Sequence, residues 1–443
     1  MTDTPTRAPR TPAPEPSWLG PYGALPRLAG GWFLPIAFAA RLPFSMLTIG
    51  TLLLVTDATG SVASGSLAGA AAALGTALGG PAQGSLADRR GQRVVLLVCT
   101  PIATLALVAM VAASTSGATP STGPVLLAAA LAGASVPQVG PLARVRWIGL
   151  TEGRPRTMSA AMSYESTADE VGFVLGPALV GILATTASPG AAMLLAAALL
   201  AAGGTAFALH PTARAAAQVG EAHATTAGGT TPAAVAGGAG LLALARAEAV
   251  PLAGMLAMGV LFGATQTATT AFTSSIGQPG LGGLLYAVMG VGSAATALAV
   301  VALPAGWSQP ARWVGFATGL TVCFAVLVPL AATGSLAAVT PGLAVAGLFV
   351  GPVMVTVFTV ASERAPAART AAAMTLVASA NVVGVAIGAA VTGQVSALGV
   401  PAAFAVPALA AGTLLVVGVL LRRGGTGHVR GLGTQRRAPA PLP

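Results

Sequence analysis

Four charged residues stand inside long apolar stretches of the sequence, where they could bind protons or charged ligands. They are Arg41, Glu165, Asp169 and Glu170. An ionised side chain at the centre of a bilayer costs about 2.5–3.5 kcal/mol even on insertion scales, so these groups require partners or water. On a helix, Glu165 and Asp169 share one face, while Glu170 is turned by about 100°. We expect at least one acid to face an internal cavity; alternatively, Glu165 lies near a membrane surface and pairs with Arg144 or Arg146.

The depth of these residues predicts an ion pair between two helices. At 1.5 Å per residue, Arg41 lies about 16 Å from the start of its apolar helix, and Asp169 about 18 Å from the start of its own. We predict that Arg41 pairs with Asp169 or Glu170, and less readily with Glu165. An acid beside a permanent cation stays ionised until its surroundings dry, so closing a cavity around it would favour proton uptake. The pair would then couple proton binding to conformation, or it would be a static contact between helices.

The elements that hold these residues are long apolar helices. Of 443 residues, 55% are hydrophobic and only 7% are charged, whereas soluble chains carry about a quarter charged residues. Lipid must therefore be the solvent for much of the surface. Breaking the sequence at charges and at Gly, Pro and Ser clusters gives twelve segments long enough to span a bilayer, and predicts an all-α membrane protein. They are 30–56, 61–83, 93–113, 123–147, 157–186, 189–209, 246–273, 280–303, 311–333, 336–361, 368–397 and 400–421.

Arginine gathers in alternate connections between these segments. The chain contains no Lys, and the connections on the other side carry Asp57 as their charged residue. By the positive-inside rule, the arginine-rich side is cytoplasmic and holds both termini. The net charge of +10 is then a signal of topology, and we expect no nucleic-acid partner because the basic residues are scattered over short loops. The predicted parts are a disordered cytoplasmic tail (1–29), a six-helix bundle (30–209), a flexible cytoplasmic linker (210–245), a second six-helix bundle (246–421) and a basic cytoplasmic tail (422–443).

The two halves repeat each other. Three glycines of the fifth segment recur in the eleventh at an offset of 212 residues, where Asp169 corresponds to Asn381. The glycines are Gly172, Gly176 and Gly181 in the first half, and Gly384, Gly388 and Gly393 in the second. Parallel repeats of a six-helix unit are a known transporter architecture, with the substrate path between the halves.

The loop after the second segment reads Gly84-Ser-Leu-Ala-Asp88-Arg89-Arg90-Gly91-Gln-Arg93. It resembles the signature of the major facilitator superfamily between helices two and three, with Gln92 in place of one basic residue. The resemblance implies that Gly84, Asp88, Arg89, Gly91 and Arg93 form a gate that holds the halves closed on the cytoplasmic side. Alternatively, the arginines only anchor the loop in the cytosol.

A second motif lies in the fifth segment. Gly172, Gly176, Pro177 and Gly181 resemble a pattern common in the superfamily's drug exporters that use proton antiport, with Val180 as a departure. Small residues at this spacing let two helices approach closely, so plain helix packing is the alternative reading. The family's architecture also places helices one and five beside a central cavity, next to each other.

Weaker polar candidates for the pathway are Gln138, Gln266 and Asn381. Each could equally be a hydrogen-bonding contact between packed helices. Two separate cysteines, and histidines confined to loops, indicate neither a metal site nor a disulfide, and we expect no cofactor.

We therefore predict a monomeric secondary active transporter, multi-pass in the cytoplasmic (plasma) membrane, that moves a small molecule by alternating access with protons as the coupling ion. Proton-coupled efflux is the leading interpretation, and proton-coupled import of a small nutrient is the alternative. An intramembrane enzyme would need a nucleophile–base pair or a metal cluster at membrane depth. A sensor would need a folded extramembrane domain. The lack of Lys excludes a Walker-type phosphate loop, which argues against an ATP-driven pump.

Overall fold

The computed structural model describes residues 20–115, 122–216, 238–278, 281–304 and 306–433. Every regular element in these ranges is a helix. Helices satisfy all their backbone hydrogen bonds within one segment, as a bilayer requires. Eleven helices of the described part are long and apolar enough to cross a membrane. α3 is a twelfth long helix of 29 residues, richer in Gly and Ser, so the predicted all-α architecture is confirmed.

The first half contains a short entry segment and six spans. In chain order its elements are η1 (Gly20–Ala24), α1 (Leu25–Ala29), α2 (Phe33–Thr59), α3 (Val62–Arg90), α4 (Gln92–Thr115), α5 (Thr122–Ser135), α6 (Val139–Leu150), α7 (Pro155–Thr186), α8 (Pro189–Leu199), η2 (Leu200–Gly204) and α9 (Thr205–Leu209). The pairs α5–α6 and α8–α9 each make up one span.

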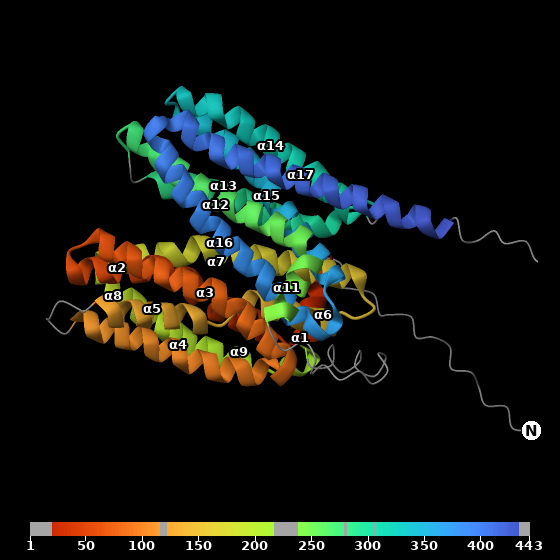
Figure 1. Cartoon of the computed structure of the whole chain (residues 1–443), viewed down its shortest axis with the longest axis horizontal. Helices are drawn as coiled ribbons and strands as arrows, with labels where there is room; N and C mark the ends of the chain where they lie inside the picture. Colours follow the sequence, from red (N-terminus) through yellow and green to blue (C-terminus); the bar gives the residue numbers. More distant parts are fainter. Residues whose placement is uncertain (1–19, 116–121, 217–237, 279–280, 305, 434–443) are drawn as a thin grey trace, which may run out of the picture.

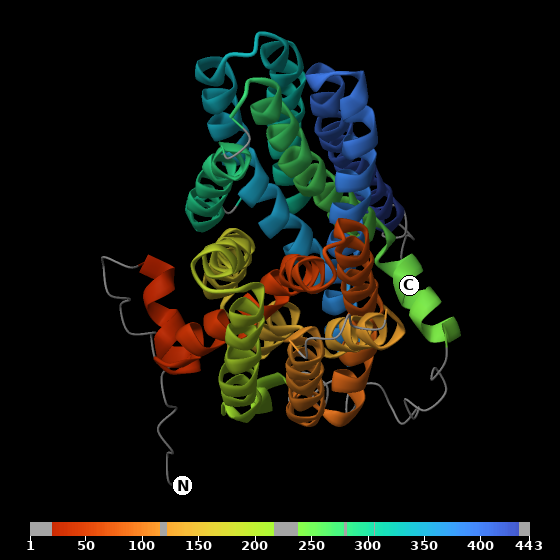
Figure 2. The same ribbon diagram turned by 90° about the vertical axis from the view of Figure 1, so that its left-hand side faces the viewer.

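The second half begins with the short helix α11 and then repeats this plan of six spans. Its elements are α11 (Gly238–Ala247), α12 (Ala249–Ser275), α13 (Gly282–Ala299), η5 (Val300–Ala302), α14 (Gln309–Ala332), α15 (Leu336–Arg364), η6 (Ala367–Arg369), α16 (Thr370–Val395), η7 (Ser396–Leu398) and α17 (Val400–Gly433). Figures 1 and 2 show the two halves one above the other, red to yellow below and green to blue above.

Close helix contacts at glycine appear at equivalent places in both halves. In the first, a Cβ on Gly176 of α7 would lie 2.0 Å from the Ser45 hydroxyl of α2. In the second, Gly384 and Gly388 of α16 touch the backbone of α12, where a Cβ would lie 2.2 Å from a carbonyl oxygen. A Cβ added to Gly181 or Gly393, the last glycines of the two motifs, would meet no atom of another described element within 4 Å. The internal repeat of the sequence is thus a repeat of helix packing.

The two halves meet along two pairs of helices. α3 packs on α16, and α7 packs on α13. We call the side of the molecule on which α3 ends with Arg89 and Arg90, and on which α16 begins, the basic side. α1 and the end of α17 lie on this side too, at the right of Figure 1.

Three boundaries differ from the sequence-based division. Two short helices, η1 and α1, occupy the last part of the stretch predicted to be a disordered tail, and its residues 1–19 lie outside the described ones. The linker ends in the helix α11, whose Leu244 packs on Ala372 and Ala373 of α16. α17 continues to Gly433, into the predicted basic tail. In the first two cases, apolar side chains of the tail and of the linker pack against the helix bundles.

Candidate functional site

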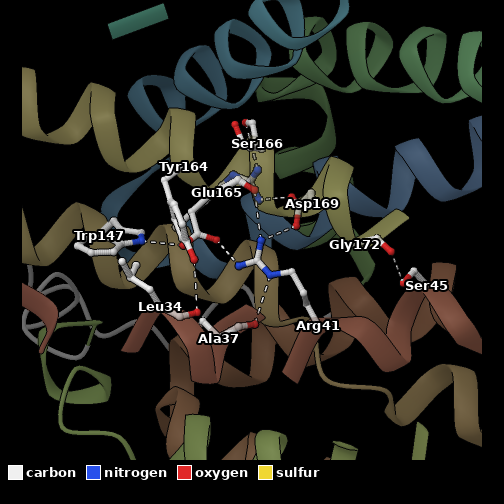
Figure 3. A network of polar contacts seen from close by, with 12 residues as sticks. Leu34, Ala37, Arg41, Ser45, Trp147, Tyr164, Glu165, Ser166, Asp169 and Gly172 are labelled. Atoms are coloured by element: carbon white, nitrogen blue, oxygen red, sulfur yellow. Dashed lines mark hydrogen bonds and ion pairs between the residues drawn. The ribbon is translucent and has the colours of Figure 1, made fainter. Parts of the chain in front are cut away.

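Arg41 of α2 holds two acids of α7 (Figure 3). Its guanidinium forms an ion pair with each of Glu165 and Asp169, and Nη1 lies 3.0 Å from Oδ1 of Asp169. Nη1 also donates to the backbone carbonyl of Glu165 at 3.2 Å, and Nε donates to the Ala37 carbonyl at 3.3 Å. The predicted pair between Arg41 and Asp169 is therefore present. Glu165, expected to be the weaker partner, binds the same guanidinium because it lies one helical turn from Asp169 on the same face.

Glu165 is the most enclosed member of this network. Its side chain is fully buried, and its second oxygen accepts a hydrogen bond from the indole Nε1 of Trp147 at 2.8 Å. Tyr164 beside it donates to the Leu34 carbonyl of α2 (Figure 3). With both carboxylate oxygens held by donors, Glu165 is a fixed anchor for Arg41.

Arg144 of α6 is a second cation at the same depth. Its Nη1 lies 2.8 Å from Oδ2 of Asp169, so the two oxygens of Asp169 face two different arginines. The sequence-based alternative that placed Arg144 near a membrane surface is therefore wrong. α6 runs from Val139 to Leu150, and it carries Arg144 completely buried. Gly140 makes room for the pair, because a Cβ there would lie 2.8 Å from Oδ1 of Asp169.

Arg146 does not join this network. Its Nε donates to Oε1 of Gln92 at 2.9 Å, and its guanidinium lies over the ring of Phe207, 3.7 Å from the centroid. The alternative in which Glu165 pairs with Arg144 or Arg146 is therefore not found. Gln92, the residue that departs from the loop signature, is buried and holds Arg146 at the basic side.

Glu170 faces away from the arginines, so the predicted alternative in which it pairs with Arg41 is not found. The hydroxyl of Ser293 on α13 donates a hydrogen bond to Oε1 of Glu170 across the boundary between the halves. Among the described residues, the ion pairs of α7 involve Glu165 and Asp169 and not Glu170. A small cavity beside this carboxyl has apolar and aromatic walls from both halves, including Phe173, Phe262 and Tyr286.

A larger cavity lies between the halves and reaches the network. Within the network Asp169 has the most exposed side chain, 18% accessible, against 5% for Arg41 and none for Glu165. Gln138 and Asn381 also line it, as predicted for the pathway. Gln266 of α12 is exposed and is not among the residues that line this cavity, so its assignment to the pathway stays a prediction. The apolar walls include Phe44, Phe173, Met255, Met354 and Phe358.

The residues predicted to form a gate tie α3 to α16 on the basic side. Both oxygens of Asp88 accept backbone hydrogen bonds from the first turn of α16, from Ala371 at 2.9 Å and Ala372 at 2.8 Å. A carboxylate at a helix N-terminus is stabilised by the unpaired amides and the helix dipole. Gly84 permits this approach, because a Cβ on it would lie 2.6 Å from the Ala371 carbonyl oxygen.

The remaining members of this motif have simpler places. Gly91 ends α3 with a φ of 82°, a conformation that favours glycine. Arg89 and Arg93 are exposed at the surface of the basic side. In the helix-five motif, Gly172 and Gly176 contact α2, Pro177 lies inside α7, and Gly181 makes no close contact.

Sequence reasoning missed three residues of the site: Trp147, Ser293 and Phe358. It named Arg144 only as an alternative partner of Glu165 near a membrane surface, at the end of the segment 123–147. Ser293 and Phe358 carry no local signal at all, since a Ser or Phe in a membrane helix is common and their partners lie on the other half of the chain.

Two six-helix halves with a polar network beside the cavity between them define a membrane transport protein. The sequence profile of the Major Facilitator Superfamily matches residues 33–389, so the chain belongs to this family. Its fold is similar to that of the human organic anion transporter MFSD10 (TETRAN), with 19% identity, a TM-score of 0.64, and coverage of 89% of this chain and 99% of that one. No curated protein matches the sequence. The family and the site agree with the prediction of a transporter and not an enzyme.

Proposed function

We propose that the protein is a secondary active transporter of the cytoplasmic membrane that exports a small molecule in exchange for protons. In this proposal the basic side is cytoplasmic, both termini lie there, and the monomer is the working unit. The observation that carries the proposal is the contrast between two neighbouring carboxyl groups of α7. Asp169 is held by two arginines, whereas Glu170 lies between the halves with a hydroxyl as its partner.

This contrast supports a division of labour. Adjacent acids in different environments take different protonation roles. Burying an ionised carboxylate without a cation is costly, and such a group neutralises instead. Glu170 would therefore bind a proton while α7 and α13 are together, and it would release the proton when separation of the halves admits water. Asp169, at the cavity wall, would contribute with its two arginines the charged surface that the cargo contacts.

The direction rests on the gate and the helix-five motif. The hydrogen bonds of Asp88 to the first turn of α16 support a state closed on the basic side. A proton that binds from outside in this state and leaves to the cytoplasm would drive cargo outward. The glycine and proline pattern of α7, which resembles that of proton-antiport exporters, favours the same direction. Import of a nutrient with protons is the alternative that the experiment below separates.

Inverted membrane vesicles with an acidic interior test the proposal. A panel of radiolabelled organic cations, anions and neutral compounds is screened for uptake that collapses when a protonophore removes the pH gradient. We expect uptake by the wild type, and loss of gradient-driven uptake but retained exchange of labelled for unlabelled cargo in Glu170→Gln. Arg41→Ala and Asp169→Asn should impair exchange itself. If gradient-driven uptake occurs instead in right-side-out vesicles with an acidic exterior, the protein is an importer. If no compound responds to the gradient, proton coupling is excluded for the panel.

A further inference from the structure

Arg144 joins the ion network to the opposite half of the molecule. Its guanidinium carbon lies 3.7 Å from the centroid of the Phe358 ring, on α15 of the second half. Its Nη1 lies 2.8 Å from Asp169, on α7 of the first half. One side chain therefore has its charge partner in its own half and its aromatic partner across the boundary.

The surroundings of Arg144 make its position depend on Asp169. The side chain is fully buried, and a buried cation needs compensation. Beyond the ion pair, Nη2 donates a long hydrogen bond of 3.4 Å to Ser166. Nε has no hydrogen-bond partner among the described residues. Asp169 is thus the main group that keeps the guanidinium over the aromatic ring.

Phe358 is placed at the basic end of the cavity. It lines the cavity and is 4% exposed, six residues before the end of α15 on the basic side. The face of an aromatic ring attracts a guanidinium, and this attraction grows when water is excluded. Because the ring belongs to the other half, the contact exists only while the halves are together at this depth.

We propose that Arg144 is a positioning residue that transmits the charge of Asp169 to the contact between the halves on the basic side. With Asp169 ionised and unoccupied, Arg144 stays over Phe358 and the basic side is closed. When a proton neutralises Asp169, the guanidinium loses its partner and turns to Glu165 or water. The contact with Phe358 is then lost, and opening of the basic side is favoured. This inference rests on the proposed transport function, since it states how that cycle is gated.

Other charged groups around Asp169 do not offer the same link. Arg41 comes from α2 and Glu165 from α7, so both act within the first half. Glu170 crosses to α13 through Ser293, near Tyr286, on another face of α7. Of the described contacts, the stacking of Arg144 on Phe358 is the one that ties Asp169 to α15.

A double-mutant cycle read by distance measurements tests this coupling. The native Cys99 and Cys323 are replaced by Ser, and spin labels are placed at the exposed positions Arg156→Cys and Glu363→Cys, on opposite halves of the basic side. The full chain is reconstituted in lipid nanodiscs without cargo. The ratio of long to short label distances reports opening, so the readout requires neither a known cargo nor a pH gradient.

We expect Asp169→Asn and Phe358→Leu each to raise this ratio about threefold or more, as loss of a cation–π contact predicts. The double variant should show no more opening than either single one, because both changes act through Arg144. The Phe358→Trp variant, which keeps an aromatic face, should remain closed on the basic side. Phe349→Leu is a matched change farther from the basic side on α15, and it should not alter the ratio of label distances. Multiplying effects in the double variant, or opening of Phe358→Trp to the extent of Phe358→Leu, would overturn the inference. Failure of proton-driven transport in vesicles would overturn the proposed function and leave these distance ratios unchanged.

Discussion

Gln83 of α3 donates its side-chain amide to the backbone carbonyl of Val136, 3.0 Å away, at the point where α5 ends and α6 has not begun. The same amide nitrogen lies 2.8 Å from the carbonyl of Ala134. Pro137 has no N–H and restricts the residue before it, which breaks the helix here. At membrane depth the freed carbonyls need donors from the protein. The amide of Gln83 is the donor for both carbonyls. α6, which carries Arg144, begins directly after this break.

Replacing Gln83 by Leu is therefore expected to destabilise the protein. The free energy of unfolding should fall by about 1–3 kcal/mol, because two buried carbonyls lose their donor. Thermal unfolding of the purified protein in detergent measures this change. Gln266→Leu is the matched control, since Gln266 is exposed on α12 and should change stability little. Equal melting temperatures for both variants would show that water or lipid satisfies the carbonyls of the break.

The proposed topology predicts which positions react from outside the cell. Single cysteines at Thr115, Ser274 or Ser335, each near an end opposite the basic side, should be labelled by an impermeant maleimide on intact cells. A cysteine at Arg214, exposed on the basic side, should react only after the membrane is opened. The physical reason is the concentration of arginine on that side. The reverse pattern would invert the orientation and with it the proposed direction of transport.

Asp88→Asn should leave the protein folded and inserted while lowering transport several-fold. The charge that caps α16 is lost, which weakens the state closed on the basic side by about 0.5–2 kcal/mol. Gly84→Ala should act in the same direction, because its methyl group meets the backbone of α16. Transport assays at matched expression check both variants, with Arg89→Gln at the exposed neighbour as control. Normal transport by Asp88→Asn would contradict the gate and support the alternative in which the loop is only an anchor in the cytosol.

Glu248 gives the stability a pH dependence outside the membrane spans. It precedes α12 with its side chain fully buried, and neither carboxylate oxygen has a hydrogen-bond partner among the described residues. Burial raises the pKa of Glu248 to about 7, against a smaller opposing effect of Arg364. A raised pKa in the folded state means that the folded protein binds the proton more tightly. The stabilising contribution is complete below the ordinary value of 4.5 and is lost as the pH rises through about 7.

Glu248→Gln should therefore raise the melting temperature at pH 8 and change it little at pH 5. The expected gain at pH 8 is on the order of 1–2 kcal/mol. Melting curves of both proteins between pH 5 and 8 measure it, with Glu152→Gln, an exposed acid of the same side, as control. Parallel curves for wild type and Glu248→Gln would contradict a neutral carboxyl at this position.

The parts of this structure that the sequence predicted are those with a local physical signal. Apolar length predicted the spans, and the four-residue spacing of Glu165 and Asp169 predicted their common face. The depth of Arg41 in its helix, together with the neighbouring helices one and five that the family resemblance implies, predicted its pair with Asp169. The offset of 212 residues predicted that the halves repeat, and in each half glycines of the motif contact a neighbouring helix.

The rest depends on contacts that one segment does not encode. The break at Pro137 turns α6 inward, and this places Arg144 at membrane depth although its neighbours in sequence are charged. Ser293 meets Glu170, and Phe358 meets Arg144, only because the halves come together. Gln266 was assigned to the pathway by its polarity alone, and it does not line the cavity at the ion network.

The network of α2, α6 and α7 has a consequence for the response to membrane voltage. Arg41, Arg144, Glu165 and Asp169 carry two positive and two negative formal charges, which sum to zero, and all four belong to the first half. When this half tilts, the network moves through the electric field as a neutral body. The field, worth about 2.3 kcal/mol per elementary charge at 100 mV, then acts on the proton and the cargo and not on these side chains. Under the proposed exchange of cargo for protons, the transient charge movement recorded after a voltage step then reports the proton and the cargo.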